Sequence, residues 1–217
     1  MTAPPQQASG VSPRFLALLA DEGLDGRRLL DVGCGWGRLA LAVAPAARHV
    51  VGLDRDPALI HEARRRAAAV RLANVEFHEA DVDREEYGRF SPDLITAHLC
   101  VSDAIVERAG RALAPGALLA MVSFHVDQWR ETGKVSRFAY DEPRMEGVLR
   151  RSGFVPEVIE LEREVAEFAS VEEALAAAVG LEGRWKADGR WPHYLRFLEE
   201  GGRTLTRSHL IVVARRS

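Results

Sequence analysis

The sequence has little cysteine, no long apolar run and no excess of basic residues. Only two cysteines occur among 217 residues, and their spacing does not match a metal site, so a reduced protein without a metal is expected. No apolar run approaches the roughly 18 residues of a membrane helix. The first ten residues, MTAPPQQASG, lack the basic start and apolar core of a signal peptide. These absences predict a cytoplasmic protein with no membrane partner.

The charge balance disfavours a nucleic-acid partner. Lys and Arg total 29 and Asp and Glu total 32, which gives a net charge of −3. Bulk attraction to nucleic acid is therefore not expected. The run Arg64–Arg66 beside Glu62 is typical of a solvated helix face rather than of an RNA-binding patch. The length fits one domain with a full core, or one domain with an insertion.

Apolar runs and helical patterns alternate along the first part of the chain. Asp56 before Pro57, and Ser12 before Pro13, are typical helix starts. Strands are expected over residues 28–32, 49–53, 74–79, 93–98 and 117–124, and helices over 13–20, 36–44, 57–69 and 102–113. This alternation predicts a parallel sheet covered by helices on both faces.

The last third of the chain breaks this alternation. Helices are expected over 141–152, 170–179 and 191–200, and strands over 154–161 and 204–215, the latter antiparallel. The predicted fold class is α/β, a doubly wound and mostly parallel seven-stranded sheet whose last strand is antiparallel and follows a helical insertion. We expect a disordered tail over 1–11 and a single domain over 12–217. Within it, residues 125–140 and 162–203 would form lid or insertion segments.

A glycine-rich turn follows the first expected strand. Asp31 lies in that strand, and Gly33, Gly35 and Gly37 follow at alternate positions before a helix begins. Such a turn lets a ligand approach bare backbone at the carboxyl end of a parallel strand. A dinucleotide site would need its third glycine at position 38, where this chain has Arg38. The pattern therefore disfavours a nicotinamide cofactor.

Acidic residues close the next two expected strands. Asp54 lies 21 residues after Gly33, and an ionised carboxylate there can accept both hydroxyl hydrogens of a ribose. Asp81 and Val82 follow the third strand in the same way. Three consecutive strand ends thus carry residue types that suit a nucleoside ligand.

Taken together, these residues resemble the class I S-adenosylmethionine-dependent methyltransferases. The resemblance spans Leu29 to Ser123. It implies that Asp54 binds the ribose, that Arg55 lies beside the adenine, and that Asp81 and the Val82 amide receive the adenine edge. The full set implied to bind the cofactor is Asp31, Gly33, Cys34, Gly35, Gly37, Asp54, Arg55, Asp81, Val82, Ala97 and His98. S-adenosylhomocysteine would be the product.

The methyl acceptor is less clear from the sequence. The fourth strand ends in Thr96-Ala97-His98-Leu99, not in the Asn/Asp-Pro-Pro-aromatic sequence of many amide and adenine-N6 methyltransferases. Where the acceptor carries a proton, a general base is needed, and the candidates are His98, His125 and Asp127, with His98 favoured. Each histidine could instead be structural. The aromatic side chains of 162–203 would form either an acceptor pocket or a packed insertion: Trp185, Trp191, His193, Tyr194 and Phe197.

The sequence therefore predicts a methyltransferase that acts on a small-molecule acceptor, as a monomer or homodimer. Alternatives are an RNA or protein methyltransferase, which would need a basic strip, and a non-catalytic S-adenosylmethionine-binding protein with a blocked acceptor site. A nicotinamide oxidoreductase is a further rival.

Overall fold

The computed structural model describes residues 10–217 and divides them into two compact units. Unit 1 comprises Met1–Ser123, Glu142–Glu160 and Ile211–Ser217, and unit 2 comprises Phe124–Asp141 and Leu161–Leu210. Most of the predicted tail, 1–11, lies outside the described residues. Of the two tail residues that are described, Gly10 is exposed and Val11 is buried in the core.

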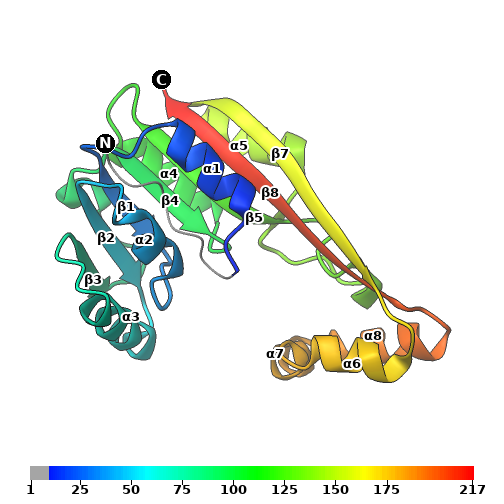
Figure 1. The fold of residues 1–217 in the computed structure, drawn as a ribbon. Helices are drawn as coiled ribbons and strands as arrows, with labels where there is room; N and C mark the ends of the chain where they lie inside the picture. Colours follow the sequence, from blue (N-terminus) through cyan, green and yellow to red (C-terminus); the bar gives the residue numbers. More distant parts are fainter. Residues whose placement is uncertain (1–9) are drawn as a thin grey trace. The chain divides into compact units, whose positions relative to one another are not determined.

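The sheet contains eight strands in the order β3-β2-β1-β4-β5-β8-β7, with a short β6 paired to β5 (Figure 1). Six of its strands pair in parallel: β1 (Arg28–Val32), β2 (His49–Asp54), β3 (Val75–Glu79), β4 (Leu94–His98), β5 (Leu118–His125) and the two-residue β6 (Ala139–Tyr140). Within it, Leu30 of β1 pairs with Val51 of β2 and with Ile95 of β4. The predicted doubly wound, mostly parallel sheet is confirmed, with one strand more than expected.

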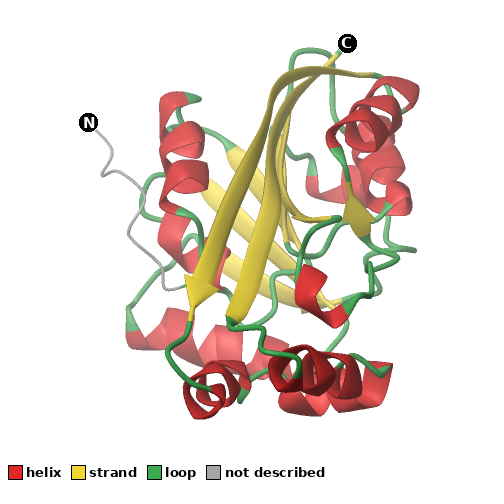
Figure 2. Ribbon diagram, turned by 90° about the vertical axis from the view of Figure 1, so that its right-hand side faces the viewer, coloured by secondary structure: helices red, strands yellow, loops and turns green. Residues whose placement is uncertain are grey.

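Helices flank the strands on both sides (Figure 2). Those of unit 1 are α1 (Pro13–Asp21), α2 (Arg38–Val43), α3 (Pro57–Ala69), α4 (Asp103–Ala112) and α5 (Glu142–Arg151), with a 3₁₀ turn η1 (Tyr87–Phe90). The predicted caps are confirmed, because Ser12 accepts from the Phe15 amide and Asp56 accepts from the Ala58 amide. The buried β1 and β4 read as continuous apolar runs because helices cover both faces.

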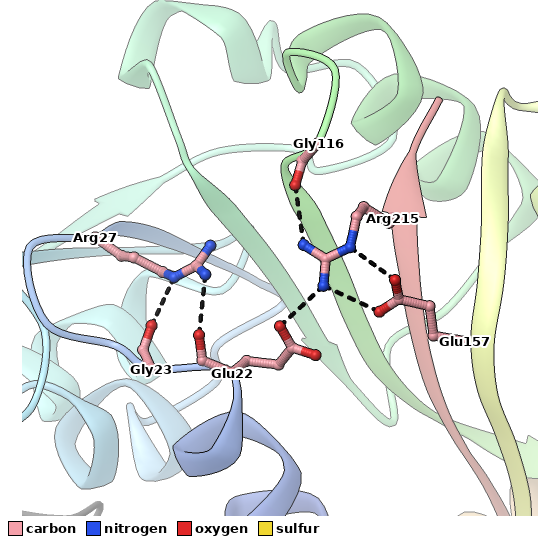
Figure 3. Close-up of polar contacts among 6 residues, drawn as sticks. All are labelled: Glu22, Gly23, Arg27, Gly116, Glu157 and Arg215. Atoms are coloured by element: carbon pink, nitrogen blue, oxygen red, sulfur yellow. Dashed lines mark hydrogen bonds and ion pairs between the residues drawn. The ribbon is translucent and has the colours of Figure 1, made fainter.

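Arg215 of β8 (Thr204–Arg216) joins three distant parts of unit 1. Its guanidinium donates to Glu157 of β7, to Glu22 at the end of α1 and to the carbonyl of Gly116 before β5 (Figure 3). Arg27 in turn donates to the carbonyls of Glu22 and Gly23. These bonds anchor the loop that leads from α1 into β1, the strand that precedes the glycine turn.

Unit 2 has its own aromatic core. It contains β6 (Ala139–Tyr140), the 3₁₀ turn η2 (Arg130–Thr132), and the helices α6 (Val171–Ala178), α7 (Glu182–Asp188) and α8 (Trp191–Glu199). Trp129, Trp185, Tyr194 and Leu198 are buried together in this core. The predicted segments 125–140 and 162–203 both fall in unit 2.

Strand β7 (Phe154–Glu167) is longer than the sequence predicts. The expected end at Leu161 is wrong, and six further residues continue the strand. The stretch from Glu162 to Glu167 contains no glycine or proline to stop a strand, and Val165 continues the alternation of apolar and polar residues. The helix α7 was also not predicted.

Candidate functional site

The glycine turn after β1 has the strained backbone that its sequence predicts. Gly33, Gly35 and Gly37 have φ angles of 71°, 54° and 84°, in the left-handed region. The Cys34 amide donates to the Leu53 carbonyl of β2 at 2.9 Å, and the Gly37 amide donates to the Cys34 carbonyl at 2.9 Å. The turn is therefore fixed to the neighbouring strand before α2 begins.

The three glycines of the turn are required for different reasons. A Cβ at Gly33 would lie 2.3 Å from the Sγ atom of Cys100, and one at Gly37 would lie 2.9 Å from the ring of Phe77. A Cβ at Gly35 would have no neighbour within 4 Å. Packing thus excludes a side chain at Gly33 and at Gly37. Gly35 faces open space, where a ligand can approach the backbone.

A pocket in unit 1 opens beside this turn. It is lined by Val11, Asp31, Gly33, Cys34, Gly35, Trp36, Arg38, Leu39 and His98. Five of these residues belong to the predicted cofactor set, namely Asp31, Gly33, Cys34, Gly35 and His98, the last of which comes from the end of β4. The fold therefore brings the glycine turn and the favoured base candidate to one pocket.

Asp31 is buried in this pocket with one oxygen unsatisfied. The Thr96 hydroxyl of β4 donates to Asp31 Oδ1 at 3.0 Å, but Oδ2 is buried and has no partner among residues 10–217. Burial raises the pKa of Asp31 to about 7, against the lowering effects of the Thr96 bond and of the Ala40 backbone. An unsatisfied buried carboxylate oxygen suits a cationic ligand group. The sequence did not indicate Thr96, since that pairing depends on the register of β1 and β4.

Asp54 lies at the end of β2, where its carboxylate binds the backbone of the glycine turn and remains partly exposed. Its carboxylate accepts from the Gly35 amide at 2.9 Å and from the Asp56 amide at 3.0 Å. The side chain is half-buried, and each carboxylate oxygen has a second lone pair to offer. Asp54 can therefore bind ribose hydroxyls while it orients the amide of Gly35. Arg55, the next residue, is exposed.

Asp81 and Val82 follow β3, the strand next to β2. The Ala80 amide donates to the Asp54 carbonyl at 2.9 Å, which ties the two strand ends together. Asp81 is exposed and accepts from the Asp83 amide at 3.1 Å. Val82 is buried, and its carbonyl accepts from the Tyr87 hydroxyl at 2.6 Å. The loop that would receive an adenine is thus itself well ordered by hydrogen bonds.

Trp36 in the turn is covered by an arginine that the sequence assigned to a solvated face. The guanidinium carbon of Arg66 lies 3.5 Å from the centroid of the Trp36 ring, and Glu62 holds Arg66 by an ion pair at 2.6 Å. Arg64 donates to the Phe77 carbonyl at 2.6 Å. Arg64 and Arg65 are exposed, as the interpretation of the run as a solvated helix face predicts, whereas Arg66 is only half-buried and packs on Trp36.

His98 and Ala97 end β4 in different surroundings. Ala97 is fully buried, so its contact with a ligand would be through the backbone. His98 is half-buried, lines the pocket and lies 6.2 Å from the ring of Phe15 in α1. The next residue, Leu99, has a φ of 57°, and its amide donates to the Val122 carbonyl at 2.7 Å. This bond fixes the strand end that carries His98.

The other two base candidates, His125 and Asp127, lie in unit 2. His125 is buried, and its Nδ1 accepts from the Asp127 amide at 3.2 Å and lies 3.1 Å from the Ser208 hydroxyl. An acceptor role for Nδ1 places the ring proton on Nε2. Asp127 forms an ion pair with Arg163. These contacts order the chain after β5.

The aromatic candidates of 162–203 do not form a common open surface. Trp185 and Tyr194 are fully buried and meet edge-on at 5.2 Å, whereas His193 is exposed. Trp191 and Phe197 pack partly against the same core. The two fully buried side chains are thus structural residues of unit 2. No cluster of three His, Cys, Asp or Glu side chains suited to a metal occurs among the described residues.

Comparison with known proteins shows the family to which the chain is similar. The family described as "Methyltransferase domain" matches residues 24–187. The chain is 31% identical over 102 residues to the ubiquinone biosynthesis O-methyltransferase of Acinetobacter baylyi, covering 43% of this chain and 42% of that protein. It is 35% identical over 95 residues to the 23S rRNA (uracil(1939)-C(5))-methyltransferase RlmD of Klebsiella pneumoniae, covering 42% of this chain and 20% of that protein. The chain therefore matches less than half the length of either relative.

Solved structures share the fold over almost the whole chain. The YcgJ protein of Bacillus subtilis superposes with a TM-score of 0.72 at 15% identity, covering 95% of this chain and all of that one. The magnesium protoporphyrin IX methyltransferase ChlM of Synechocystis, solved with bound S-adenosylmethionine, superposes with a TM-score of 0.60 at 16% identity, covering 94% and 76%. These likenesses show the fold.

The fold is that of a Rossmann-like α/β protein, with a pocket beside the glycine turn at the carboxyl end of β1. The chain belongs to the class I S-adenosylmethionine-dependent methyltransferase family. The resemblance that the sequence suggested is thereby confirmed, and S-adenosylmethionine is the cofactor of this family. No helix among the described residues is long and apolar enough to cross a membrane.

Proposed function

We propose that this protein transfers a methyl group from S-adenosylmethionine to a small-molecule acceptor. The observation that carries the proposal is the unsatisfied Oδ2 of Asp31, buried beside the open backbone of Gly35. A carboxylate there would hold the positively charged amino-acid part of the cofactor. The sulfonium of the cofactor supplies an already activated methyl group.

Residues at the ends of β2 and β3 would bind the rest of the cofactor. Asp54 would accept the ribose hydroxyls, and its bond to the Gly35 amide would hold the turn in the receiving conformation. Asp81 would accept the adenine amino group and the Val82 amide would meet a ring nitrogen, with Arg55 beside the ring. Each of these roles is a proposal supported by the position of the residue at a strand end.

His98 would remove the acceptor proton. It lines the pocket with Asp31 and Gly33, and it is half-buried at the end of β4. An imidazole is matched to proton abstraction near neutral pH. His125 and Asp127 are less suited to this role, since Nδ1 of His125 accepts a backbone amide and Asp127 is paired with Arg163.

The small-molecule acceptor is supported by the charge balance. A net charge of −3 gives no general attraction for RNA. Two of the three arginines of the run on α3 are engaged with Trp36 and with the Phe77 carbonyl. An RNA acceptor is the second candidate, favoured by the similarity of the chain to RlmD over 95 residues.

The cofactor part of the proposal is tested by calorimetric titration with S-adenosylhomocysteine and, separately, with NAD. We expect saturable binding of S-adenosylhomocysteine and none of NAD. No binding at about 1 mM S-adenosylhomocysteine, together with binding of NAD, would refute the proposal.

The acceptor is tested with S-adenosylmethionine labelled in its methyl group, incubated in parallel with a metabolite panel and with total RNA. Label in a metabolite is the expected result. Label in RNA would replace the small-molecule proposal with the RNA candidate. Binding of the cofactor with no transfer to either pool would favour a non-catalytic protein.

A further inference from the structure

The charged residues of α7 differ in how they are paired. Glu182 forms an ion pair with Lys186 at 2.6 Å, and Asp188 pairs with Arg190. Arg184 lies between them and is exposed, and no carboxylate of residues 10–217 forms an ion pair with it. Arg184 is thus without an ion-pair partner among the described residues.

Two aromatic rings hold the Arg184 side chain in place. Its guanidinium carbon lies 5.5 Å from the ring centroid of Trp129 and 5.9 Å from that of Phe124, within the range of cation–π attraction. These ring contacts do not use the five N–H donors of the guanidinium, which can donate hydrogen bonds to a carboxylate. The two rings thus orient the Arg184 side chain.

Trp129 is fixed in an unusual backbone conformation. Its φ is 57°, which a bulky residue rarely adopts. The strained conformation is maintained by the Trp129 amide, which donates to the Thr206 carbonyl at 3.0 Å, and by the Thr132 amide, which donates to the Trp129 carbonyl at 2.9 Å. Backbone strain of this kind persists where surrounding structure enforces it and is concentrated at functional sites.

The second ring, Phe124, offers a flat apolar surface beside Arg184. Phe124 is half-buried, and it lies 5.7 Å from Trp129 and 5.8 Å from the imidazole of His209. Burial lowers the pKa of His209, which favours the neutral form of its ring. Three planar rings and one guanidinium thus meet within unit 2.

We propose that Phe124, Trp129, Arg184 and His209 form a binding site for a planar aromatic compound that carries a carboxylate. The ring of the compound would pack against Phe124 and His209, and its carboxylate would accept hydrogen bonds from Arg184. This inference goes beyond the proposed function, because it concerns a ligand site within unit 2 whose occupation requires no methyl donor.

The test uses three small probes and the full-length protein. Benzoate is both aromatic and anionic, benzamide is aromatic and neutral, and cyclohexanecarboxylate is anionic without a π system. Each is titrated by calorimetry into the wild type, Arg184→Gln, Phe124→Leu and the control Arg196→Gln. Arg196 is an exposed arginine of α8 in the same unit. Thermal unfolding of each variant confirms that it is folded.

We expect benzoate to bind the wild type and Arg196→Gln equally. Arg184→Gln should weaken benzoate binding about tenfold, the effect of losing a charge-assisted hydrogen bond. Phe124→Leu should weaken benzoate more than cyclohexanecarboxylate, and benzamide should bind the wild type and Arg184→Gln alike. Equal benzoate affinity in Arg184→Gln and Arg196→Gln, or no saturable benzoate binding to a folded wild type, would overturn the inference. Neither result would affect the S-adenosylhomocysteine titration, so the two proposals fail separately.

Discussion

Two carboxylates, one in each unit, show how the polar interiors of the two units differ. Glu131 of unit 2 accepts from the Thr206 amide at 3.0 Å and from the hydroxyls of Thr204 and Thr206. Asp31 of unit 1 is more deeply buried, yet its Oδ2 has no partner among residues 10–217. A carboxylate whose oxygens are all hydrogen-bonded stabilises the fold. A buried carboxylate with an unpaired oxygen destabilises the fold unless a ligand supplies the missing partner. The difference supports the proposal that Asp31 binds a ligand, and the predictions below test it.

The largest expected effect distinguishes the two histidines, His98 and His125. His98→Gln should lower turnover about 100-fold with an acceptor found in the labelled-methyl panel, since general-base catalysis contributes at least that much. S-adenosylhomocysteine affinity should change little. His125→Gln should instead lower the unfolding temperature, because Nδ1 of His125 accepts a backbone amide. Loss of turnover in His125→Gln with none in His98→Gln would reverse the assignment.

The second prediction compares Asp31 with Glu131 directly through stability. Burial raises the pKa of Asp31 from 3.8 to about 7, so the folded protein binds a proton that the unfolded chain has lost. The stability that this proton contributes is present below about pH 4 and is lost as the pH rises to about 7. At pH 8, Asp31→Asn should therefore raise the unfolding free energy by roughly 3–4 kcal/mol, and by much less at pH 4.

Glu131→Gln should have the opposite effect. It weakens satisfied hydrogen bonds and should lower the unfolding free energy by about 1–3 kcal/mol. Urea unfolding of both variants at pH 4 and pH 8 measures the two effects. If Asp31→Asn destabilised the protein at pH 8, the claim that the Asp31 carboxylate is buried with an unpaired oxygen would be wrong.

A third prediction separates packing from backbone strain in the glycine turn. Gly33 and Gly26 both have a positive φ, but a Cβ at Gly26 would have no neighbour within 4 Å. Gly26→Ala should cost about 1–2 kcal/mol from the left-handed backbone alone. Gly33→Ala should cost about 1–3 kcal/mol more because its Cβ would collide with Cys100 Sγ. Equal unfolding free energies for the two variants would contradict this packing role.

The smallest predicted effect concerns two neighbouring aspartates. Asp54→Ala should weaken S-adenosylhomocysteine binding by about 1–3 kcal/mol, as the ribose and the Gly35 amide lose an acceptor. Asp56→Ala removes the N-cap of α3 and should lower stability by about 1 kcal/mol while leaving the affinity unchanged. Calorimetry and urea unfolding on both variants distinguish the roles. Unchanged affinity in Asp54→Ala would remove the ribose assignment.

Much of unit 1 could be predicted from the sequence because its strands are continuous apolar runs that end at turn residues. The caps Ser12 and Asp56, and the glycine turn itself, are local features and were predicted at the right positions. Unit 2 was harder. Helix α7 has no side-chain cap and contains Gly183, and β6 has only two residues. Such elements are stabilised by packing, which a local pattern does not reveal.

The same limit applies to the pocket. The acidic residues at the strand ends were predicted, because they stand out against apolar runs. Thr96 and Cys100 were not, since they reach Asp31 and Gly33 only through the sheet register and the chain that follows β4. The contact of Arg66 in α3 with Trp36 in the glycine turn likewise joins two residues that are 30 positions apart in the sequence.

The central claim is that Asp31 is an unsatisfied buried carboxylate that binds the cationic part of the cofactor. Calorimetric titration of S-adenosylhomocysteine into the wild type and Asp31→Asn, from pH 5.5 to pH 8.5, tests it most directly. For the wild type, affinity should fall by up to about tenfold per unit of pH below about 7, as binding requires loss of the Asp31 proton. Asp31→Asn should bind weakly at every pH. A wild-type affinity that does not change with pH, or an Asp31→Asn variant that binds as tightly as the wild type, would contradict the account.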